Sequence, residues 1–284
     1  MNQLLEDLII VMTLERIEIN LFRGQSRDIG SPQVFGGQVL GQALVAATAT
    51  VENRSVHSLH AYFLRRGDFN SPIVYEVDRA WDGKHFSTRR VVAIQHGEQI
   101  FNMSASFQLP EAGLDHQTAM PDVPAPEALP DLESQYRAAL ANAPPAIRRI
   151  MEQKRPFEFK PVNPEFMRVE KSSPLKYVWF RAVDALPDDE ALHRCLLAYV
   201  SDFHLLDTAL KPHGVSMASG KLTVASIDHA MWFHRTVRVD DWLLYVIDSP
   251  SASGARGFTR GSIFSRDGRL VASAAQEGLI RVNA

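Results

Sequence analysis

Hydrophobic residues follow two different periods in this chain, and the two periods alternate. Residues 36–47 are small and apolar on all sides after a glycine-rich start, and residues 188–206 carry apolar side chains at helical spacing. After each of these segments, stretches rich in Val, Ile, Phe, Trp and Tyr alternate apolar with polar positions, which is typical of strands. The pattern predicts an α+β protein with two central helices, each followed by several long antiparallel strands.

The two halves of the chain repeat each other. The segment His57–Arg65 is echoed 170 residues later by Ile227–Arg235, and the tyrosines at 75 and 245 follow at the same offset. A repeat of this length indicates one structural unit built twice. We therefore expect a sheet wrapped around one buried helix, made once in each half.

Proline marks the boundary between the copies. Eleven of the 16 prolines lie in the segment that joins them. Within this connector, residues 131–140 have the composition of a helix with an acidic first turn. The sequence thus predicts an N-terminal unit of residues 1–109, a proline-rich connector of residues 110–175 and a C-terminal unit of residues 176–284.

Composition excludes several classes of partner. The 284 residues are 45% hydrophobic and 22% charged, as in globular proteins, and the net charge of −3 does not favour nucleic acid or an anionic membrane surface. The single cysteine, Cys195, excludes an intrachain disulfide and fits a reducing compartment. We find no secretory signal, no apolar run long enough to span a bilayer and no peroxisomal address at the C-terminus. These features predict a soluble cytoplasmic protein.

An acidic residue interrupts the apolar face of the second predicted helix. Asp202 follows Cys195 by seven residues, which places it about 20° from that residue around a helical wheel. A carboxylate near an apolar stripe must be paired, hydrogen-bonded or shifted in pKa. Asp202 is therefore either a buried structural acid or a candidate site residue.

Two more polar residues lie on predicted inward faces of strands. Ser226 shares a strand face with Ala230 and Trp232, and Gln276 occupies an apolar face of the last strand. Each residue alone is most often a buried hydrogen-bonding group. Asp228 adjoins Ser226 and competes with Asp202 as the acid of any site.

Other candidate sites are weaker. The glycine spacing at residues 36–41 is that of a phosphate loop, but Gln42 and Ala43 stand where Lys and Ser or Thr are required. A metal site would need the spacing of a recognised ligand set, and none is found among Asp202, His204, Asp228, His229 and His234. The histidines of this group are therefore expected to be ordinary strand residues. Ser226 lacks the surroundings of a nucleophilic serine, and Cys195 is expected in the core.

The chain resembles the acyl-CoA thioesterase II family, which has a double hotdog fold, over nearly its full length. The resemblance implies a sheet wrapped around a long helix in each repeat. It also implies hydrolysis of fatty acyl-CoA thioesters without a metal, a cofactor or a covalent triad. The matching segments, in chain order, are Leu21-Phe-Arg-Gly-Gln-Ser, Gln33-Val-Phe-Gly-Gly-Gln-Val, His57-Ser-Leu-His-Ala-Tyr-Phe-Leu-Arg, Ala225-Ser-Ile-Asp-His-Ala-Met-Trp-Phe-His-Arg, Ser253-Gly-Ala-Arg-Gly-Phe and Gln276-Glu-Gly.

The resemblance carries a catalytic trio onto this chain: Asp202, Ser226 and Gln276. Many members have Thr where this chain has Ser226, which keeps the hydroxyl but loses the methyl that restricts its rotamers. We expect Asp202 to accept a proton from the attacking water and the other two residues to position that water. The resemblance also favours Asp202 over Asp228 as the acid. Further matching residues are expected to contact the substrate: Gly36, Gly37, Gln38, His57, Arg65 and Arg235.

The expected substrates are medium- to long-chain fatty acyl-CoA esters, with the acyl chain in an apolar tunnel and the nucleotide near surface arginines. Two alternatives stay open. The spacing of Asp202 and His204 fits an enoyl-CoA hydratase of the same fold, and a non-catalytic acyl-CoA-binding module would bind without releasing thiol. The first copy carries no equivalent trio, which predicts one active site per chain. The fold also leads us to expect a homo-oligomer, a dimer or a tetramer.

Overall fold

The structure, a computed structural model, covers residues 1–284 and describes all of them except 32, 131–147, 149–152, 163–169, 217–221 and 284. The helix predicted at residues 131–140 therefore lies outside the described residues. The described elements are α1 (Gln3–Met12), β1 (Glu15–Glu18), β2 (Leu21–Gly24), α2 (Gly36–Thr48), β3 (Ser55–Phe63), β4 (Ile73–Asp82), β5 (Phe86–Gln95), β6 (Glu98–Gln108), η1 (Pro126–Ala128), β7 (Phe157–Pro161), β8 (Leu175–Ala182), α5 (Glu190–Ser201), η2 (Leu206–His213), β9 (Leu222–Ser226), β10 (Asp228–Phe233), β11 (Leu243–Ser253), β12 (Arg256–Ser265) and β13 (Leu270–Val282).

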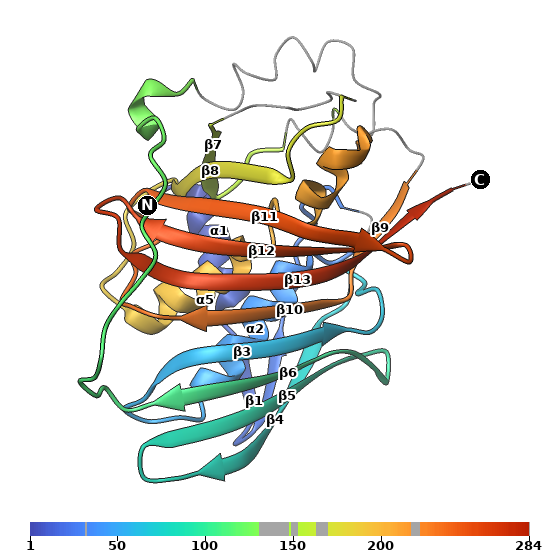
Figure 1. Ribbon diagram of the computed structural model, residues 1–284. Helices are drawn as coiled ribbons and strands as arrows, with labels where there is room; N and C mark the ends of the chain where they lie inside the picture. The colour runs from blue at the N-terminus through green and yellow to red at the C-terminus, as the bar shows by residue number, and fades with distance from the viewer. Residues whose placement is uncertain (32, 131–147, 149–152, 163–169, 217–221, 284) are drawn as a thin grey trace.

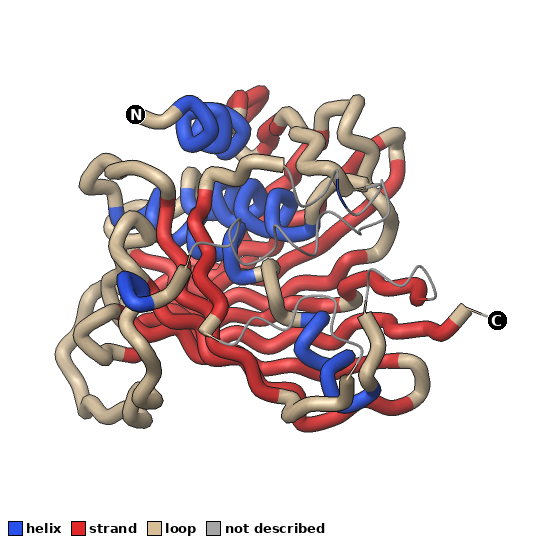
Figure 2. Tube along the Cα trace, turned by 90° about the horizontal axis from the view of Figure 1, so that it is seen from above, coloured by secondary structure: helices blue, strands red, loops and turns tan. Residues whose placement is uncertain are grey.

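The described strands form one 13-stranded antiparallel sheet (Figure 1). Its order is β1-β2-β4-β5-β6-β3-β10-β13-β12-β11-β8-β7, with β9 paired to β13. The first half of this order comes from the first repeat and the second half from the second repeat. The helices α2 and α5 pass behind the sheet in Figure 1, and Figure 2 shows the sheet curving around them.

The two repeats meet where β3 pairs with β10. His60 is opposite Ala230, its own counterpart at the 170-residue offset, and the pairs on either side follow the same symmetry. A pseudo-twofold axis therefore crosses the sheet at this pair. Equivalent residues of the two repeats lie on opposite sides of the axis, so they face opposite ends of the shared strands.

The central helices pack closely because α2 presents glycines to α5. A Cβ on Gly37 would lie 2.2 Å from the backbone oxygen of Tyr199, and one on Gly41 would lie 3.2 Å from the oxygen of Cys195. Side chains larger than hydrogen would push the two helices apart. Most of α2 is buried, as its uniformly apolar sequence predicted.

The structure changes three details of the prediction. The helix predicted over residues 188–206 is shorter, since α5 spans Glu190–Ser201 and the chain then turns, with φ 67° at His204. The single strand predicted around Ser226 is two strands, β9 and β10, separated at Ile227. Part of the predicted connector is also ordered sheet, because β7 at Phe157–Pro161 pairs with β8. The sheet of the second repeat thus begins inside the connector.

None of the described helices is long and apolar enough to cross a membrane.

Candidate active site

Asp202 lies at the C-terminal end of α5, at the boundary between the two repeats. Its side chain is 6% exposed. One carboxylate oxygen, Oδ1, accepts a hydrogen bond of 2.7 Å from Gln276 Nε2 on β13. The other oxygen, Oδ2, faces α2 of the first repeat, where a Cβ on Gly36 would lie only 2.8 Å from it. The carboxylate therefore touches elements from both halves of the chain.

The N-terminus of α2 supplies positive character beside this carboxylate. The N-cap, Phe35, makes no side-chain capping hydrogen bond in the described part of the chain. The N–H groups of Gly36 and Gly37 belong to the first turn, where no partner exists within the helix. The positive end of a helix dipole favours a nearby anion. This end of α2 can thus stabilise Asp202 or an oxyanion formed next to it.

Gln276 connects Asp202 to a buried histidine. Besides its bond to Asp202, the Nε2 atom of Gln276 lies 3.2 Å from Nδ1 of His229 on β10. The other amide atom, Oε1, is buried and has no hydrogen-bond partner among the described residues. The far ring nitrogen of His229, Nε2, lies 3.0 Å from Ser201 Oγ. These four side chains form a continuous polar chain in an otherwise apolar interior.

Burial lowers the pKa of His229, and the nearby Asp202 carboxylate only partly opposes this effect. The imidazole is therefore neutral at neutral pH.

A cavity of about 250 Å³ takes its walls from both repeats and is lined by Gly36, the residue that faces Asp202 Oδ2. Asp202 and Gln276 themselves are not among its lining residues. Gly36 and Ser226 line it together with apolar side chains, and two arginines stand at its edge. Arg65 is already engaged, since its Nε lies 2.6 Å from Glu98 and its Nη1 donates to the backbone oxygen of Gln99. The lining residues are Gln33, Val34, Gly36, Val39, Phe63, Leu64, Arg65, Arg66, Gly67, Ile100, Phe101, Ala225 and Ser226.

Four of the predicted substrate residues do not line the cavity. Gly37 packs against α5, and Gln38 is buried and accepts a hydrogen bond from the backbone N–H of Arg27. His57 bonds Ser106 near the start of β3, six residues or about 20 Å along the strand from the cavity residue Phe63. Arg235 is the counterpart of Arg65, and the pseudo-twofold axis places it at the other end of the paired strands.

The position of Ser226 has a different cause from the one predicted. The inward face of β10 consists of His229, Met231 and Phe233, whereas Trp232 is 38% exposed. Ser226 reaches the cavity because β9 ends there, paired with Gly278 of β13. The prediction that Ser226 shares an inward face with Ala230 and Trp232 is thus wrong.

Asp228 is not part of the same cluster. Its carboxylate accepts a hydrogen bond of 2.7 Å from the backbone N–H of Glu277, and it alternates with the inward residue His229. Burial raises the pKa of Asp228. Among the two competing acids, Asp202 is the one that adjoins Gln276 and the cavity residue Gly36.

Asp202 and His204 do not form a catalytic pair. His204 turns away from the site, accepts a hydrogen bond from Lys176 at Nδ1 and packs edge-on against Phe159. Burial and the Lys176 charge hold its pKa well below the usual value.

Other reactive groups of the described chain are also unsuited to a site. Cys195 is buried, and burial raises its pKa to about 12. The thiolate nucleophile is therefore absent at neutral pH. Within the described ranges, no three His, Cys, Asp or Glu side chains are grouped to hold a metal ion.

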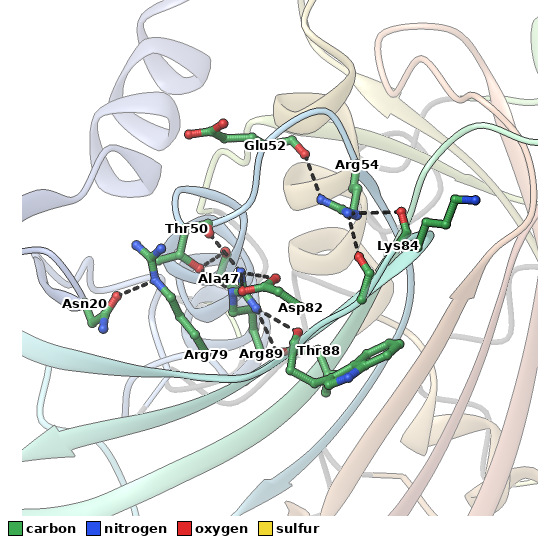
Figure 3. A network of polar contacts seen from close by, with 12 residues as sticks. Asn20, Ala47, Thr50, Glu52, Arg54, Arg79, Asp82, Lys84, Thr88 and Arg89 are labelled. Atoms are coloured by element: carbon green, nitrogen blue, oxygen red, sulfur yellow. Dashed lines mark hydrogen bonds and ion pairs between the residues drawn. The ribbon is translucent and has the colours of Figure 1, made fainter.

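The first repeat has a buried arginine close to the end of its own central helix. Thr259 on β12 lies opposite Gln276, and its counterpart at the 170-residue offset is Arg89 on β5. The buried Arg89 guanidinium donates to Thr50 Oγ1 at 2.9 Å and to Asp82 at 2.8 Å (Figure 3). Thr50 follows α2 by two residues, so a cation lies just beyond the end of this helix. The first repeat therefore does not reproduce the polar chain of the second repeat.

His229 is the residue that sequence reasoning missed. The pattern predicts an unbroken strand from Ser226, and such a strand gives His229 the outward face. A signal was present in the repeat itself. The register that places Leu59 opposite Ala105 in the first repeat places His229 opposite Gln276 in the second. A polar pair has replaced an apolar pair at one position of the core.

The chain is similar to known thioesterases along its whole length. Residues 23–108 match the family described as acyl-CoA thioesterase N-terminal domain, and residues 150–279 match the family described as acyl-CoA thioesterase. Acyl-CoA thioesterase 2 of Haemophilus influenzae is 44% identical over 284 residues, which cover 99% of each protein.

Two solved structures are similar to this chain in fold. The acyl-CoA thioesterase II from Mycobacterium marinum has 43% sequence identity and a TM-score of 0.79, covering 98% of this chain and 99% of that one. A protein with a hot dog fold from Alicyclobacillus acidocaldarius has a TM-score of 0.79 at 19% identity, over 98% of this chain and 99% of that one. The second likeness concerns the fold alone. The predicted double hotdog fold is confirmed, and the chain belongs to the acyl-CoA thioesterase II family, whose members hydrolyse acyl-CoA thioesters.

Proposed function

We propose that this enzyme hydrolyses medium- to long-chain fatty acyl-CoA esters by direct attack of a water molecule that Asp202 activates. A thioester carbonyl is electrophilic enough for water to attack it without a nucleophile from the enzyme. Asp202 accepts the proton of the water while the water oxygen bonds to the carbonyl carbon. The tetrahedral intermediate then expels CoA thiolate, which takes up a proton, and the fatty acid is released.

The observation that carries this proposal is the arrangement of the Asp202 carboxylate. Gln276 holds Oδ1 at 2.7 Å, and Oδ2 is turned toward Gly36 on the cavity wall. A base held in place through one oxygen is suited to general-base catalysis, and we propose that the other oxygen, Oδ2, accepts the proton of the water. The Oε1 atom of Gln276, which has no partner in the described part of the chain, and the hydroxyl of Ser226 are the groups that would accept from or donate to the same water.

The start of α2 is the proposed oxyanion site. The N–H groups of Gly36 and Gly37 point out of the first helical turn, and their donors are not consumed within the helix. Fixed donors of this kind stabilise negative charge that develops on a carbonyl oxygen in the transition state. The absence of a Cβ at Gly36 lets the carbonyl approach both the helix end and Asp202.

The cavity supports an acyl-CoA substrate. Its inner walls include Val34, Phe63 and Phe101, which suit an alkyl chain. Arg66 at its edge is exposed, and we propose that it contacts the CoA phosphates. Arg65 is bound to Glu98 and would have to exchange that partner to do the same.

Single-turnover hydrolysis in ¹⁸O-labelled water tests direct attack. With enzyme in excess over decanoyl-CoA, one ¹⁸O atom should enter decanoate and none should enter the protein. Rapid acid quenching should likewise yield no acylated protein in the mass spectrum. Label in the peptide that contains Asp202, or an acyl adduct on it, would instead establish an anhydride intermediate.

Gly36→Ala tests the proposed junction of α2 and Asp202. The added methyl would lie 2.8 Å from Asp202 Oδ2 and 3.0 Å from the Phe63 ring, so the carboxylate must move away. We expect kcat to fall by about 10-fold or more, because small displacements of reacting groups are costly. Gly41→Ala adds a methyl to the same helix away from the cavity and should keep kcat near the wild-type value. Equal kcat values for the two variants would contradict the proposed geometry.

A further inference from the structure

The structure assigns a role to His229: it is a positioning residue that orients the Gln276 amide for the water that attacks the thioester. His229 has no contact with the cavity, since its ring is fully buried behind Gln276. This inference rests on the proposed roles of Asp202 and Gln276, and it adds a residue that acts through them.

The hydrogen-bonding partners allow only one orientation of the Gln276 amide. Its Nε2 atom lies 2.7 Å from a carboxylate oxygen of Asp202 and 3.2 Å from His229 Nδ1. An amide NH₂ group has two hydrogens to donate and accepts none. Both amide hydrogens are used in these two bonds, so Oε1 is the amide atom that stays available to accept a hydrogen bond from water. It is buried and has no partner among the described residues. A flipped amide would place two oxygen atoms 2.7 Å apart.

The same reasoning fixes the tautomer of the histidine. His229 Nδ1 must accept, so the ring proton is on Nε2, where it is donated to Ser201 Oγ at 3.0 Å. Ser201 in turn donates to the backbone oxygen of Ala198 at 2.9 Å. The chain of donors therefore runs in one direction, from Gln276 to His229 and from His229 through Ser201 into the last turn of α5. Asp202 directly follows that turn.

The first repeat supplies an internal comparison. At the position of His229 and Gln276 it has the apolar pair Leu59 and Ala105, both buried. The fold can therefore fill this position without a hydrogen bond. The fold alone therefore does not require a histidine here, and this histidine is linked to the residue that holds Asp202.

A double-mutant cycle on kcat tests the inference. The variants are His229→Leu, Gln276→Ala and the two combined, assayed by thiol release from decanoyl-CoA. If His229 acts through Gln276, His229→Leu should lower kcat by about 10-fold with little change in KM, in the range reported for groups that orient residues at a reacting centre. In the Gln276→Ala background, the same substitution should cause almost no further loss.

Two more variants separate positioning from stability. His229→Asn offers a side-chain oxygen near the place of Nδ1 and should recover most of the lost activity. His234→Leu is the matched control, because it removes a histidine–serine bond to Ser273 at the exposed end of the same strand region. It should leave kcat unchanged. If His229→Leu alone does not fold, the double variant, which recreates the Leu59–Ala105 pair, and His229→Asn still complete the comparison.

The outcomes distinguish the inference from the proposed function. Three results would overturn the role of His229 and leave the proposed function standing. His229→Leu could lower kcat equally with and without Gln276, it could raise KM without lowering kcat, or His229→Asn could fail to recover the activity. Wild-type kcat in Gln276→Ala would overturn both, because Gln276 would then not position the water. A loss that depends on Gln276 and recovers with Asn supports the inference.

Discussion

Replacement of Asp202 by Asn should lower kcat for decanoyl- and palmitoyl-CoA by about 10²–10⁴-fold, the usual contribution of a general base. Asn is nearly isosteric with Asp and keeps an oxygen that can accept the 2.7 Å hydrogen bond from Gln276. The amide nitrogen then occupies the place of Oδ2, beside Gly36. Asp202→Asn therefore puts an amide nitrogen, which cannot accept a proton, in place of the proposed base. The packing around the side chain is preserved.

The Asp202→Asn measurement needs a control for the loss of one negative charge. Asp248 on β11 is paired with Arg260 on an exposed part of the second repeat's sheet, and neither residue lines the cavity. Asp248→Asn therefore makes the same change in net charge at a residue outside the proposed site. We expect wild-type kcat in this control and an unchanged thermal midpoint in both variants. If Asp202→Asn retained near wild-type turnover, Asp202 would not be the base and the mechanism proposed above would be wrong.

The internal repeat and the two hydrophobic periods are sufficient to predict most of the fold. The equal offset of His57–Arg65 and Ile227–Arg235 predicted two equal units, and the two segments contribute the strands β3 and β10 at their junction. Periodicity could not show where α5 ends, because Phe203 continues the helical spacing although the chain has already turned. Phe203 instead packs against Phe35, with ring centroids 4.3 Å apart.

The candidate site was only partly predictable, because it is formed between the repeats. A helical wheel showed that Asp202 is buried, and strand alternation showed that Gln276 faces the interior. Neither could show that Gly36 of the other repeat lies against Asp202, since that contact depends on how α2 and α5 pack. The pseudo-twofold axis between β3 and β10 explains why Arg65 lies at the cavity while its counterpart Arg235 does not.

Replacement of Gly37 by Ala should destabilise the protein by about 3 kcal/mol, the upper part of the range for overpacked cores. The new Cβ would lie 2.2 Å from the backbone oxygen of Tyr199 and 2.5 Å from the Phe35 ring. A backbone atom within α5 cannot move by itself, so the two central helices must separate. The gain of about 1 kcal/mol in helix propensity for Gly→Ala does not offset this cost.

Chemical denaturation of a three-variant series would show that the cause is the helix contact. At Gly41 the nearest atoms to an added Cβ are 3.1 Å and 3.2 Å away, on Met12 and Cys195, and at Gly113 nothing lies within 4 Å. Gly41→Ala should therefore be destabilised less than Gly37→Ala, and Gly113→Ala by less than about 0.5 kcal/mol. Equal free energies of unfolding for the Gly37 and Gly41 variants would mean that α2 and α5 can adjust their spacing freely. Because the start of α2 also faces Asp202, a rigid spacing at Gly37 is what would hold the proposed oxyanion donors and the proposed base at a fixed separation.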